Sequence, residues 1–535
     1  MFWADRIAGE IEKKFGKTKE PLLIRDEKTV SGRVHVGSMR GAAIHGVMHE
    51  VLTEKGVPNT FVWEHNDFDP MDDIPVYLDR AVYEEHLGKP LYKIPSPDPS
   101  AKNFGEYFAK EFQHVIEATG WHPQFVWASE LYLKGQMDSV IREALQAAEQ
   151  IRTIQKEVSG ADRKEGVLPI SVVCPQCGKM STTEATDFDG ETVMANCYPT
   201  KVEWTKGCGF EGRISPFGGN AKLYWKADWP AKWKVYGVCV EGEGKDHATR
   251  GGSRDVANHI SKEVFHYEPP FDIPYEFLLV GGKKMSSSKG RGSSAKEIAA
   301  LVPPKILRLA LLGKDINQQF NFDPEGDTIP NLYDLYDKFV EHRRQGYQDD
   351  HTVMQGSRPE VSPGTVDDYS RLFELIHPER KLPPKDAIFP RFSQVAFVVQ
   401  MPHLDMNKEF LDADPVELAE RAAYAKKWLE QCAPEKFVFT LQATLPDTAR
   451  ELSAVQKKAF GEILQYLEAL DAMPSGEEFH QFLHTLKESV PIAPAELFSA
   501  LYLVFLGKAY GPKAGWFLSV LDRHFVLERL EAAIQ

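Results

Sequence analysis

The chain has 535 residues, of which 42% are hydrophobic and 26% charged, a composition typical of soluble globular proteins. Its length exceeds what one ordinary core supports and predicts roughly two to four domains. The formal net charge of −15 argues against a small, wholly basic nucleic-acid-binding module, although a large enzyme can still carry a local basic surface.

The first part of the chain alternates between strand-like and helix-like patterns. Residues 21–25 form a short apolar run, residues 44–52 place apolar side chains at helical spacing, and residues 59–63 form a second strand-like run. A strand–helix–strand unit predicts a parallel sheet with a ligand at the carboxyl ends of its strands. His35 follows the first strand and the acidic segment 67–73 follows the second, so both should face one crevice.

The pattern changes further along the chain. Residues 104–158 have helical periodicity, whereas the next segment is rich in Cys, Gly and Thr and predicts an insertion with short strands. Strand-like runs return at 234–238 and 275–280, with a crossover helix expected over 255–264. Beyond about residue 320 the pattern is helical. We therefore predict an α/β fold with the first half of a Rossmann-like parallel-sheet domain over 1–165, an insertion over 166–222, its second half over 223–320 and an all-α region over 321–535.

Four cysteines in the predicted insertion resemble a metal-binding set. Cys174 and Cys177 form a Cys-x-x-Cys pair followed by glycine, which is the usual half-site of a zinc ribbon. Cys197 and Cys208 are eleven residues apart, where a second half-site would have two or three. Four thiolates suit a structural, tetrahedral Zn²⁺. The alternatives are a degenerate ribbon without metal and a reduced pair of thiols.

Two short segments carry the residue types that grip a polyphosphate. Residues 31–37, Ser-Gly-Arg-Val-His-Val-Gly, lie at the predicted strand-to-helix turn, where backbone N–H groups and the helix dipole face an anion. Residues 284–290, Lys-Met-Ser-Ser-Ser-Lys-Gly, bring ammonium and hydroxyl groups into a glycine-bounded loop. Each segment alone also fits an ordinary helix start or basic turn. Together, in this order, they predict an ATP site.

The two segments are similar to the HIGH and KMSKS signatures of the class I aminoacyl-tRNA synthetases. Ser38 and Ser287 depart from those signatures, which leaves open whether Lys289 supplies the missing second lysine. Blocks in the same order along nearly the whole chain resemble the class I lysyl-tRNA synthetases: residues 31–40, 65–70, 228–233, 244–253, 267–270 and 511–515. This resemblance implies a Rossmann-like catalytic domain with an inserted zinc-ribbon-like module, followed by an all-α anticodon-binding domain.

The resemblance also implies roles for individual residues. His35 and Lys284 would be catalytic, with His35 hydrogen-bonding the phosphates and Lys284 neutralising charge that develops on the β- and γ-phosphates. Glycine at the turn would let the backbone approach the nucleotide, which a side chain would block. The implied ATP-binding residues are Gly32, Gly37, Asp246, His247, Lys284, Ser286, Ser287 and Ser288.

A lysine substrate needs acidic or carbonyl groups around its ammonium and an aromatic wall along its methylenes. The family pattern places Arg25, Thr29, Trp225, His247, Glu268 and Tyr275 in that pocket. Trp225 and Tyr275 fit a hydrophobic core equally well, and His247 alone would fit an ordinary loop histidine.

The implied activity is that of a lysine-tRNA ligase using ATP with Mg²⁺, with a structural Zn²⁺ in the insertion. The lysine carboxylate attacks the α-phosphate of ATP, pyrophosphate leaves, and the terminal ribose of lysine tRNA takes the aminoacyl group. Such chemistry depends on positioning and charge neutralisation. The alternatives are a glutamyl- or arginyl-type enzyme of the same class and a non-catalytic RNA-binding paralogue.

The expected partners are L-lysine, ATP and lysine tRNA, and the expected state is a monomer. The N-terminal residues lack a signal pattern, no apolar stretch reaches membrane-spanning length, and six cysteines in so long a chain do not indicate a disulfide scaffold. We therefore expect a cytoplasmic protein without a membrane partner.

Overall fold

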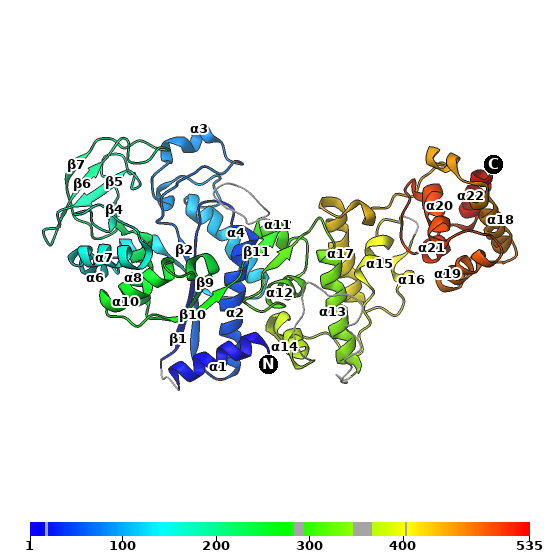
Figure 1. The fold of residues 1–535 in the computed structure, drawn as a ribbon, viewed down its shortest axis with the longest axis horizontal. Coiled ribbons are helices and arrows are strands. Elements are labelled where there is room, and N and C mark those ends of the chain that lie inside the picture. The colour runs from blue at the N-terminus through cyan, green and yellow to red at the C-terminus, as the bar shows by residue number, and fades with distance from the viewer. Residues whose placement is uncertain (17–19, 283–293, 346–365, 402–403) are drawn as a thin grey trace. The chain divides into compact units, whose positions relative to one another are not determined.

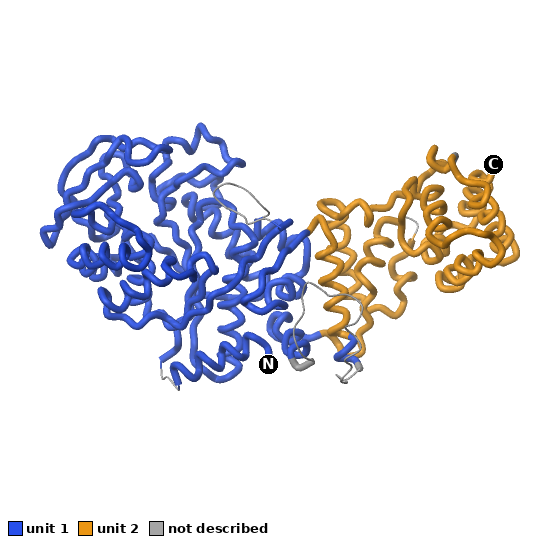
Figure 2. Tube along the Cα trace, viewed as in Figure 1, with its two compact units in different colours: residues 1–323, 341–382 blue, residues 324–340, 383–535 orange. Residues whose placement is uncertain are grey.

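The computed structural model describes residues 1–16, 20–282, 294–345, 366–401 and 404–535. The chain divides into two compact units, Met1–Asp323 with Glu341–Leu382, and Pro324–Val340 with Pro383–Gln535 (Figure 2). The helical region expected from residue 321 is therefore shared between the two units, and the domain boundaries drawn from the sequence stay predictions.

The first unit is built on a parallel sheet, which confirms the predicted α/β class. Its strands lie in the order β10-β9-β1-β2-β3, and each neighbouring pair is parallel. The carboxyl ends of these strands consequently meet at one edge. The strands are β1 (Leu22–Thr29), β2 (Asn59–Asn66), β3 (Gln124–Trp127), β9 (Val238–Gly244) and β10 (Phe271–Tyr275).

Helices cover both faces of this sheet (Figure 1). On one face α2 contacts β1, β2 and β9, and on the other α8 packs on β9 and against α10. Helix α2 is buried from Met39 to Met48 because it lies between the sheet and α1 and α12. The bounds are α1 (Trp3–Phe15), α2 (Met39–Glu54), α3 (Arg80–Tyr83), α4 (Phe104–Ala118), α5 (Ala128–Leu133), α6 (Asp138–Gln146), α7 (Ala148–Ser159), α8 (Trp225–Tyr236), α9 (Lys245–Ala248), α10 (Ser253–Glu263), α11 (Ala295–Ala299), α12 (Pro304–Leu312) and α14 (Val366–Ile376).

Three expected elements were wrong in detail. The run 234–238 is the end of α8, because Gly237 adopts a left-handed conformation (φ 72°) that stops the helix, and β9 starts only at Val238. The run 275–280 belongs to two sheets, since β10 ends at Tyr275 and β11 (Leu278–Val280) pairs with β12 (Phe320–Phe322). Strand β3 interrupts the stretch 104–158 that was expected to be helical.

The insertion consists of short antiparallel strands, as expected from its composition. One small sheet pairs β4 (Ile170–Val172) with β8 (Ala221–Leu223). The other contains β5 (Thr183–Thr186), β6 (Val193–Cys197) and β7 (Glu211–Ile214).

The second unit is helical, and its described residues contain no strand, which confirms the all-α prediction for the C-terminal region. The sequence places five apolar residues at helical spacing: Phe460, Ile463, Leu464, Leu467 and Leu470. The first four lie on α18 and are buried, whereas Leu470 follows the end of the helix and is half-buried. The helices are α13 (Thr328–Gln345), whose last turn lies in the first unit, and α15 (Phe392–Val398), α16 (Met406–Glu409), α17 (Pro415–Gln431), α18 (Ala454–Glu468), α19 (Gly476–Thr485), α20 (Pro494–Leu506), α21 (Ala514–Ser519) and α22 (Arg523–Ile534).

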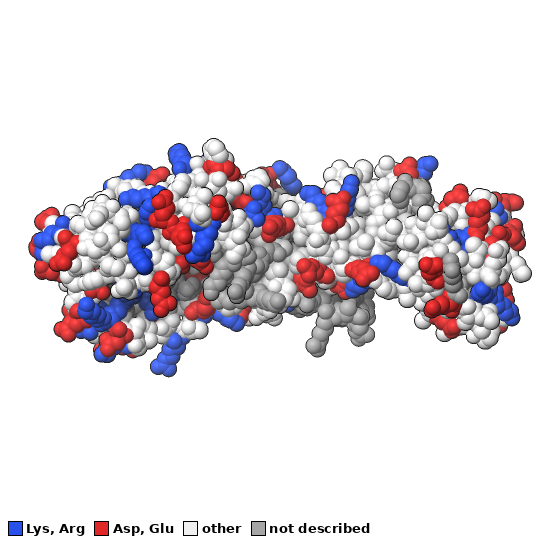
Figure 3. Space-filling model, turned by 90° about the horizontal axis from the view of Figure 1, so that it is seen from above, with Lys and Arg blue, Asp and Glu red and all other residues white. Residues whose placement is uncertain are grey.

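The surface charge is mixed. On the face that Figure 3 presents, lysine and arginine side chains are interspersed with aspartate and glutamate. Among the described helices, none has the length and apolar character that a bilayer crossing requires.

Candidate active site

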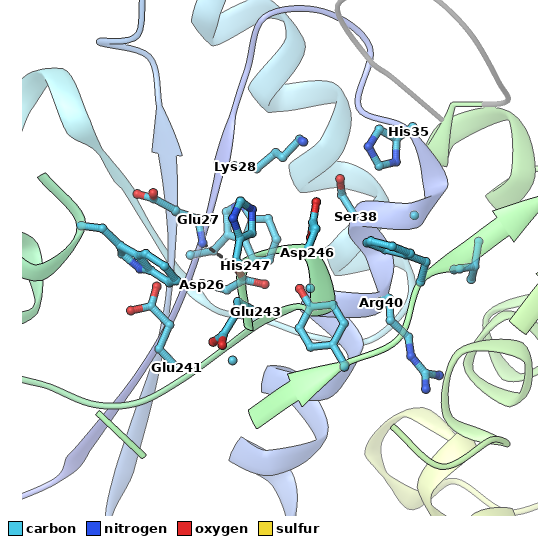
Figure 4. Close-up of a pocket in the computed structure, with 18 of the residues that line it drawn as sticks. Asp26, Glu27, Lys28, His35, Ser38, Arg40, Glu241, Glu243, Asp246 and His247 are labelled. Carbon is cyan, nitrogen blue, oxygen red and sulfur yellow. Dashed lines mark hydrogen bonds between the residues drawn. The ribbon is translucent and has the colours of Figure 1, made fainter. Parts of the chain in front are cut away.

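A cavity of about 230 Å³ lies at the carboxyl ends of β1, β9 and β10 (Figure 4). This is the edge where the parallel sheet was expected to bind a ligand. Its acidic lining residues are Asp26, Glu27, Glu241, Glu243 and Asp246. Its basic ones are Lys28, His35, Arg40 and His247. Its aromatic ones are Trp63, Trp225, Trp229, Tyr275 and Phe277. The cavity is thus rich in both carboxylates and aromatic rings.

His35 lies at the start of the helical segment that leads into α2. It precedes the short helix η1 (Val36–Ser38), and the Ser38 amide donates to the His35 carbonyl over 3.0 Å. The flanking Val34 and Val36 are buried and anchor the turn, while the imidazole lines the cavity. A β-bridge joins His35 to Ser294, so the chain passes beside His35 again directly before α11. The turn therefore offers an imidazole and a helix start to an anion.

Under the cavity lies a set of interlocked buried charges, which we call the buried charge network. Its members are Arg25, Glu27, Glu64, Asp69, Lys222, Asp228, Lys232 and Glu241. The Arg25 guanidinium reaches Glu241 at 2.6 Å and Glu64 at 2.9 Å. The Lys232 ammonium reaches Glu64 at 2.5 Å, Asp228 at 3.0 Å and Glu27 at 3.1 Å.

The carboxylates of this network keep the side chain of Lys232 charged. Burial lowers the pKa of Lys232, but the carboxylates of Asp228, Glu27 and Glu64 more than offset that effect, so the pKa lies well above its usual value. Lys222 connects the network to the insertion, because it lies on β8 and pairs with Asp69 and, at 3.5 Å, with Asp228.

The four cysteines of the insertion converge despite their irregular spacing. Their sulfur atoms all lie within 4.8 Å of one another, with Cys174 and Cys208 at 3.5 Å and Cys177 and Cys197 at 3.7 Å. A tetrahedral zinc site with Zn–S bonds of about 2.3 Å has sulfur atoms about 3.8 Å apart. Strand β6 ends at Cys197, and the chain then loops back so that the Cys208 amide donates to the Cys197 sulfur. The thiols therefore fit such an ion.

A family model described as tRNA synthetases class I (K) matches residues 1–358, about two thirds of the chain. The chain belongs to this family of class I synthetases. A lysine–tRNA ligase from Methanosarcina barkeri is 33% identical over 100% of this chain and 98% of its own length. One from Archaeoglobus fulgidus is 29% identical over 100% of both chains. A solved glutamate tRNA ligase from Elizabethkingia meningosepticum aligns with a TM-score of 0.41 at 13% identity, covering 96% of this chain and 99% of that one. That likeness is too weak to carry an inference.

The fold brings together many of the residues that the class I signatures singled out. The following line the cavity: His35, Gly37, Trp225, Asp246, His247 and Tyr275. They come from the β1–α2 turn, α8, α9 and β10, and their roles in binding ATP and the amino acid stay predictions. Lys284, Ser286, Ser287 and Ser288 lie outside the described residues.

Four other predicted residues do not line the cavity: Arg25, Thr29, Gly32 and Glu268. Arg25 is fully buried in the charge network, and the Thr29 hydroxyl donates to Asp69 over 2.6 Å. Glu268 is exposed and lies 3.8 Å from Lys262. The cavity lining therefore does not support direct contact between these four residues and a substrate, and their predicted roles remain untested.

Sequence reasoning missed several lining residues, above all Glu27, Glu241 and Trp229. A signal existed for two of them. Glu27 ends an acidic pair on β1, and Glu241 and Glu243 alternate on β9, where apolar residues are the rule for a buried parallel strand.

Helix α2 approaches the cavity closely at Gly41. A Cβ at this position would lie 2.8 Å from the Tyr275 hydroxyl and closer still to the Asp26 carboxylate. We expect Gly41→Ala to lower the free energy of unfolding by about 1–3 kcal/mol and to reduce activity, because both neighbours line the cavity. The matched control is Gly9→Ala on α1, where nothing lies within 4 Å, and which should gain up to about 1 kcal/mol. Urea denaturation of both variants checks this, and equal stabilities would contradict it.

Proposed function

We propose that the chain is a lysine–tRNA ligase that forms lysyl-adenylate from L-lysine and ATP and transfers the lysyl group to lysine tRNA. The observation that carries this proposal is the cavity itself, in which acidic and aromatic side chains adjoin a histidine at a helix start. Relatives that cover the whole chain and bear the name lysine–tRNA ligase support the same substrate.

ATP lies with its phosphates toward His35. The imidazole donates a hydrogen bond to the phosphates as negative charge shifts toward pyrophosphate, and Gly37 leaves room for the nucleotide near the backbone. Lys284 supplies positive charge in this proposal. Asp246 and His247 contact the ribose and the amino acid. Mg²⁺, when bound, would further neutralise the phosphates, and Asp246 is the acidic lining residue outside the sheet that suits it.

L-lysine lies with its carboxylate toward the α-phosphate and its side chain along the aromatic rings. Trp225 and Trp229 stack with centroids 5.1 Å apart, and His247 lies 6.1 Å from each. Such a wall packs the lysine methylenes and attracts the ammonium through its π faces. Tyr275 closes the cavity from β10.

Transfer requires tRNA, and we assign anticodon binding to the helical second unit on family resemblance. A monomeric, cytoplasmic enzyme stays our expectation.

ATP–pyrophosphate exchange in the presence of tRNA tests this function. Exchange should depend on L-lysine and not on glutamate, because a cavity rich in carboxylates repels a glutamate side chain. It should not depend on arginine either, since relatives that match the whole chain bear the name lysine–tRNA ligase. The assay includes tRNA, since enzymes of this subgroup often activate their amino acid only when tRNA is bound. Exchange that depends on glutamate or arginine would instead support the alternative specificities.

We also propose that the four clustered thiols hold one structural Zn²⁺. The ion would join the Cys174–Cys177 turn to the end of β6 and leave no open coordination position for chemistry. Purified protein should contain about one zinc per chain by elemental analysis, as expected for a closed four-thiolate site.

The variant Cys177→Ser should lose that zinc and melt at a lower temperature, whereas Cys239→Ser, which changes a thiol outside the cluster, should retain both. Wild-type protein that contains no zinc after expression in zinc-supplemented medium would contradict the metal site.

A further inference from the structure

One oxygen of a buried carboxylate at the cavity has no hydrogen-bond partner in the part of the chain that the structure describes. The Glu27 side chain is 8% exposed and lines the cavity. Its Oε2 accepts from Arg25 at 2.5 Å and from Lys232 at 3.1 Å. Its Oε1 is buried and has no hydrogen-bond partner among the residues that the structure describes. A buried carboxylate oxygen left in this state is costly unless a ligand satisfies it.

We propose that Glu27 Oε1 accepts the side-chain ammonium of the amino-acid substrate and so determines specificity for lysine, with Lys232 and Arg25 as positioning residues that hold Oε2. This assignment rests on the proposed function. Glu268, which the family pattern placed in the same pocket, is exposed and does not line the cavity.

Two of the other strand-borne carboxylates of the cavity, Asp26 and Glu241, are already engaged. Asp26 accepts from the Glu27 amide at 2.8 Å and pairs with His45 at 3.2 Å. Glu241 accepts from Arg25 through one oxygen and from the Trp233 indole through the other.

Glu243 is the remaining candidate, because its Oε1 is also buried without a hydrogen-bond partner among the described residues. Burial raises the pKa of Glu243 to about 9, with Asp272 adding to the rise against the opposing effect of Arg254, which lies at 2.9 Å. A carboxyl that holds its proton at neutral pH is a poor counter-ion. Glu27 is therefore the strand carboxylate best suited to an ammonium.

The charge balance beneath the cavity points the same way. The buried charge network contains three cations, Arg25, Lys222 and Lys232, and five carboxylates. Glu27, Glu64, Asp228 and Glu241 are buried, and Asp69 is 30% exposed. An excess of buried negative charge favours a cationic ligand over a neutral or anionic one. The ammonium of a bound lysine would offset part of this negative charge.

The position of Glu27 suits the length of the substrate. Glu27 lies across the cavity from His35, in the carboxyl-terminal half of β1 (Figure 4). With the phosphates at His35, the reacting carboxylate of the amino acid must lie on that side. The extended side chain then carries its ammonium toward the opposite wall, where Glu27 lies.

The test measures aminoacylation of lysine tRNA by full-length Glu27→Gln with two substrates, L-lysine and 6-hydroxynorleucine, in which a neutral hydroxyl replaces the ammonium. The variant should lose about 10- to 100-fold in kcat/KM for lysine, the usual effect of removing a charge-assisted hydrogen bond. The value for 6-hydroxynorleucine and the KM for ATP should change by less than about threefold, because neither depends on the charge of Glu27.

Two further variants complete the design. Glu149→Gln makes the same change at an exposed residue of α7 and should match the wild type. If Glu27→Gln does not fold, Glu27→Asp keeps the charge of the network but withdraws the carboxylate by one methylene, and it should show the same selective loss for lysine.

Equal losses for lysine and 6-hydroxynorleucine, or no loss for either, would overturn the role of Glu27 while leaving the lysine–tRNA ligase function intact. A selective loss in Glu268→Gln instead of Glu27→Gln would overturn it as well. Failure of the wild-type enzyme to charge lysine would overturn the proposed function itself, and this assignment with it.

Discussion

Replacing His35 with alanine is expected to slow amino-acid activation about 10²- to 10³-fold, the usual effect of removing one preorganised donor from a developing negative charge. The imidazole lines the cavity at the start of the helical segment before α2, held by the buried Val34 and Val36. Because the charge on the phosphates grows during the reaction, the loss should fall mainly on kcat and leave the KM for ATP little changed. The rate of ATP–pyrophosphate exchange with lysine and tRNA, measured over a range of ATP concentrations, gives both parameters.

A control variant tests whether the loss of activity is specific to His35 or follows the removal of another histidine. His259 lies on α10, is half exposed and pairs with Glu263 at 2.7 Å, so His259→Ala should keep wild-type activity. Exchange by His35→Ala at the wild-type rate would show that the imidazole does not act on the phosphates.

The largest stability effect is expected at Lys232. This ammonium is fully buried and faces Glu27, Glu64 and Asp228 within 3.1 Å. Lys232→Met leaves three buried carboxylates without that counter-charge, and breaking a buried ion pair from one side costs about 3–5 kcal/mol. Urea denaturation followed by tryptophan fluorescence should report a loss of this size from the free energy of unfolding.

The same helix offers the control. Lys234 also pairs with a carboxylate, Glu143 at 2.7 Å, but both side chains are about one third exposed. Lys234→Met should therefore cost less than about 1 kcal/mol, as surface ion pairs usually do. Equal losses in the two variants would mean that the network beneath the cavity contributes no more than a surface pair.

The sheet and one end of the site could be predicted from the sequence because their signals are local. The buried runs at 21–25 and 59–63 became β1 and β2, and the glycine-histidine turn between them lies at the cavity as expected. The run at 234–238 misled because a short apolar segment looks alike in a buried helix and a buried strand. The backbone conformation of Gly237 decides between them, and composition does not reveal it.

The acidic end of the site could not be predicted in the same way. Glu27, Lys232 and Glu241 come from β1, α8 and β9, which the fold alone brings together. Glu27 combines two features: its Oε1 is buried without a hydrogen-bond partner among the described residues, and its Oε2 is held by Arg25 and Lys232. Neither feature can be read from the sequence. The cysteine cluster was easier to predict, because only six residues of the chain are cysteines and four of them lie in the insertion. The irregular spacing of Cys197 and Cys208 did not prevent the prediction.

The central claim is that this class I synthetase charges tRNA with lysine. Aminoacylation of total tRNA with labelled L-lysine, by the purified full-length protein with ATP and Mg²⁺, tests it most directly. We predict acid-precipitable lysyl-tRNA that forms only with enzyme, ATP and tRNA together, and no product with labelled glutamate or arginine. Charging of glutamate or arginine in place of lysine, or no charging by a folded enzyme that binds ATP, would contradict the account.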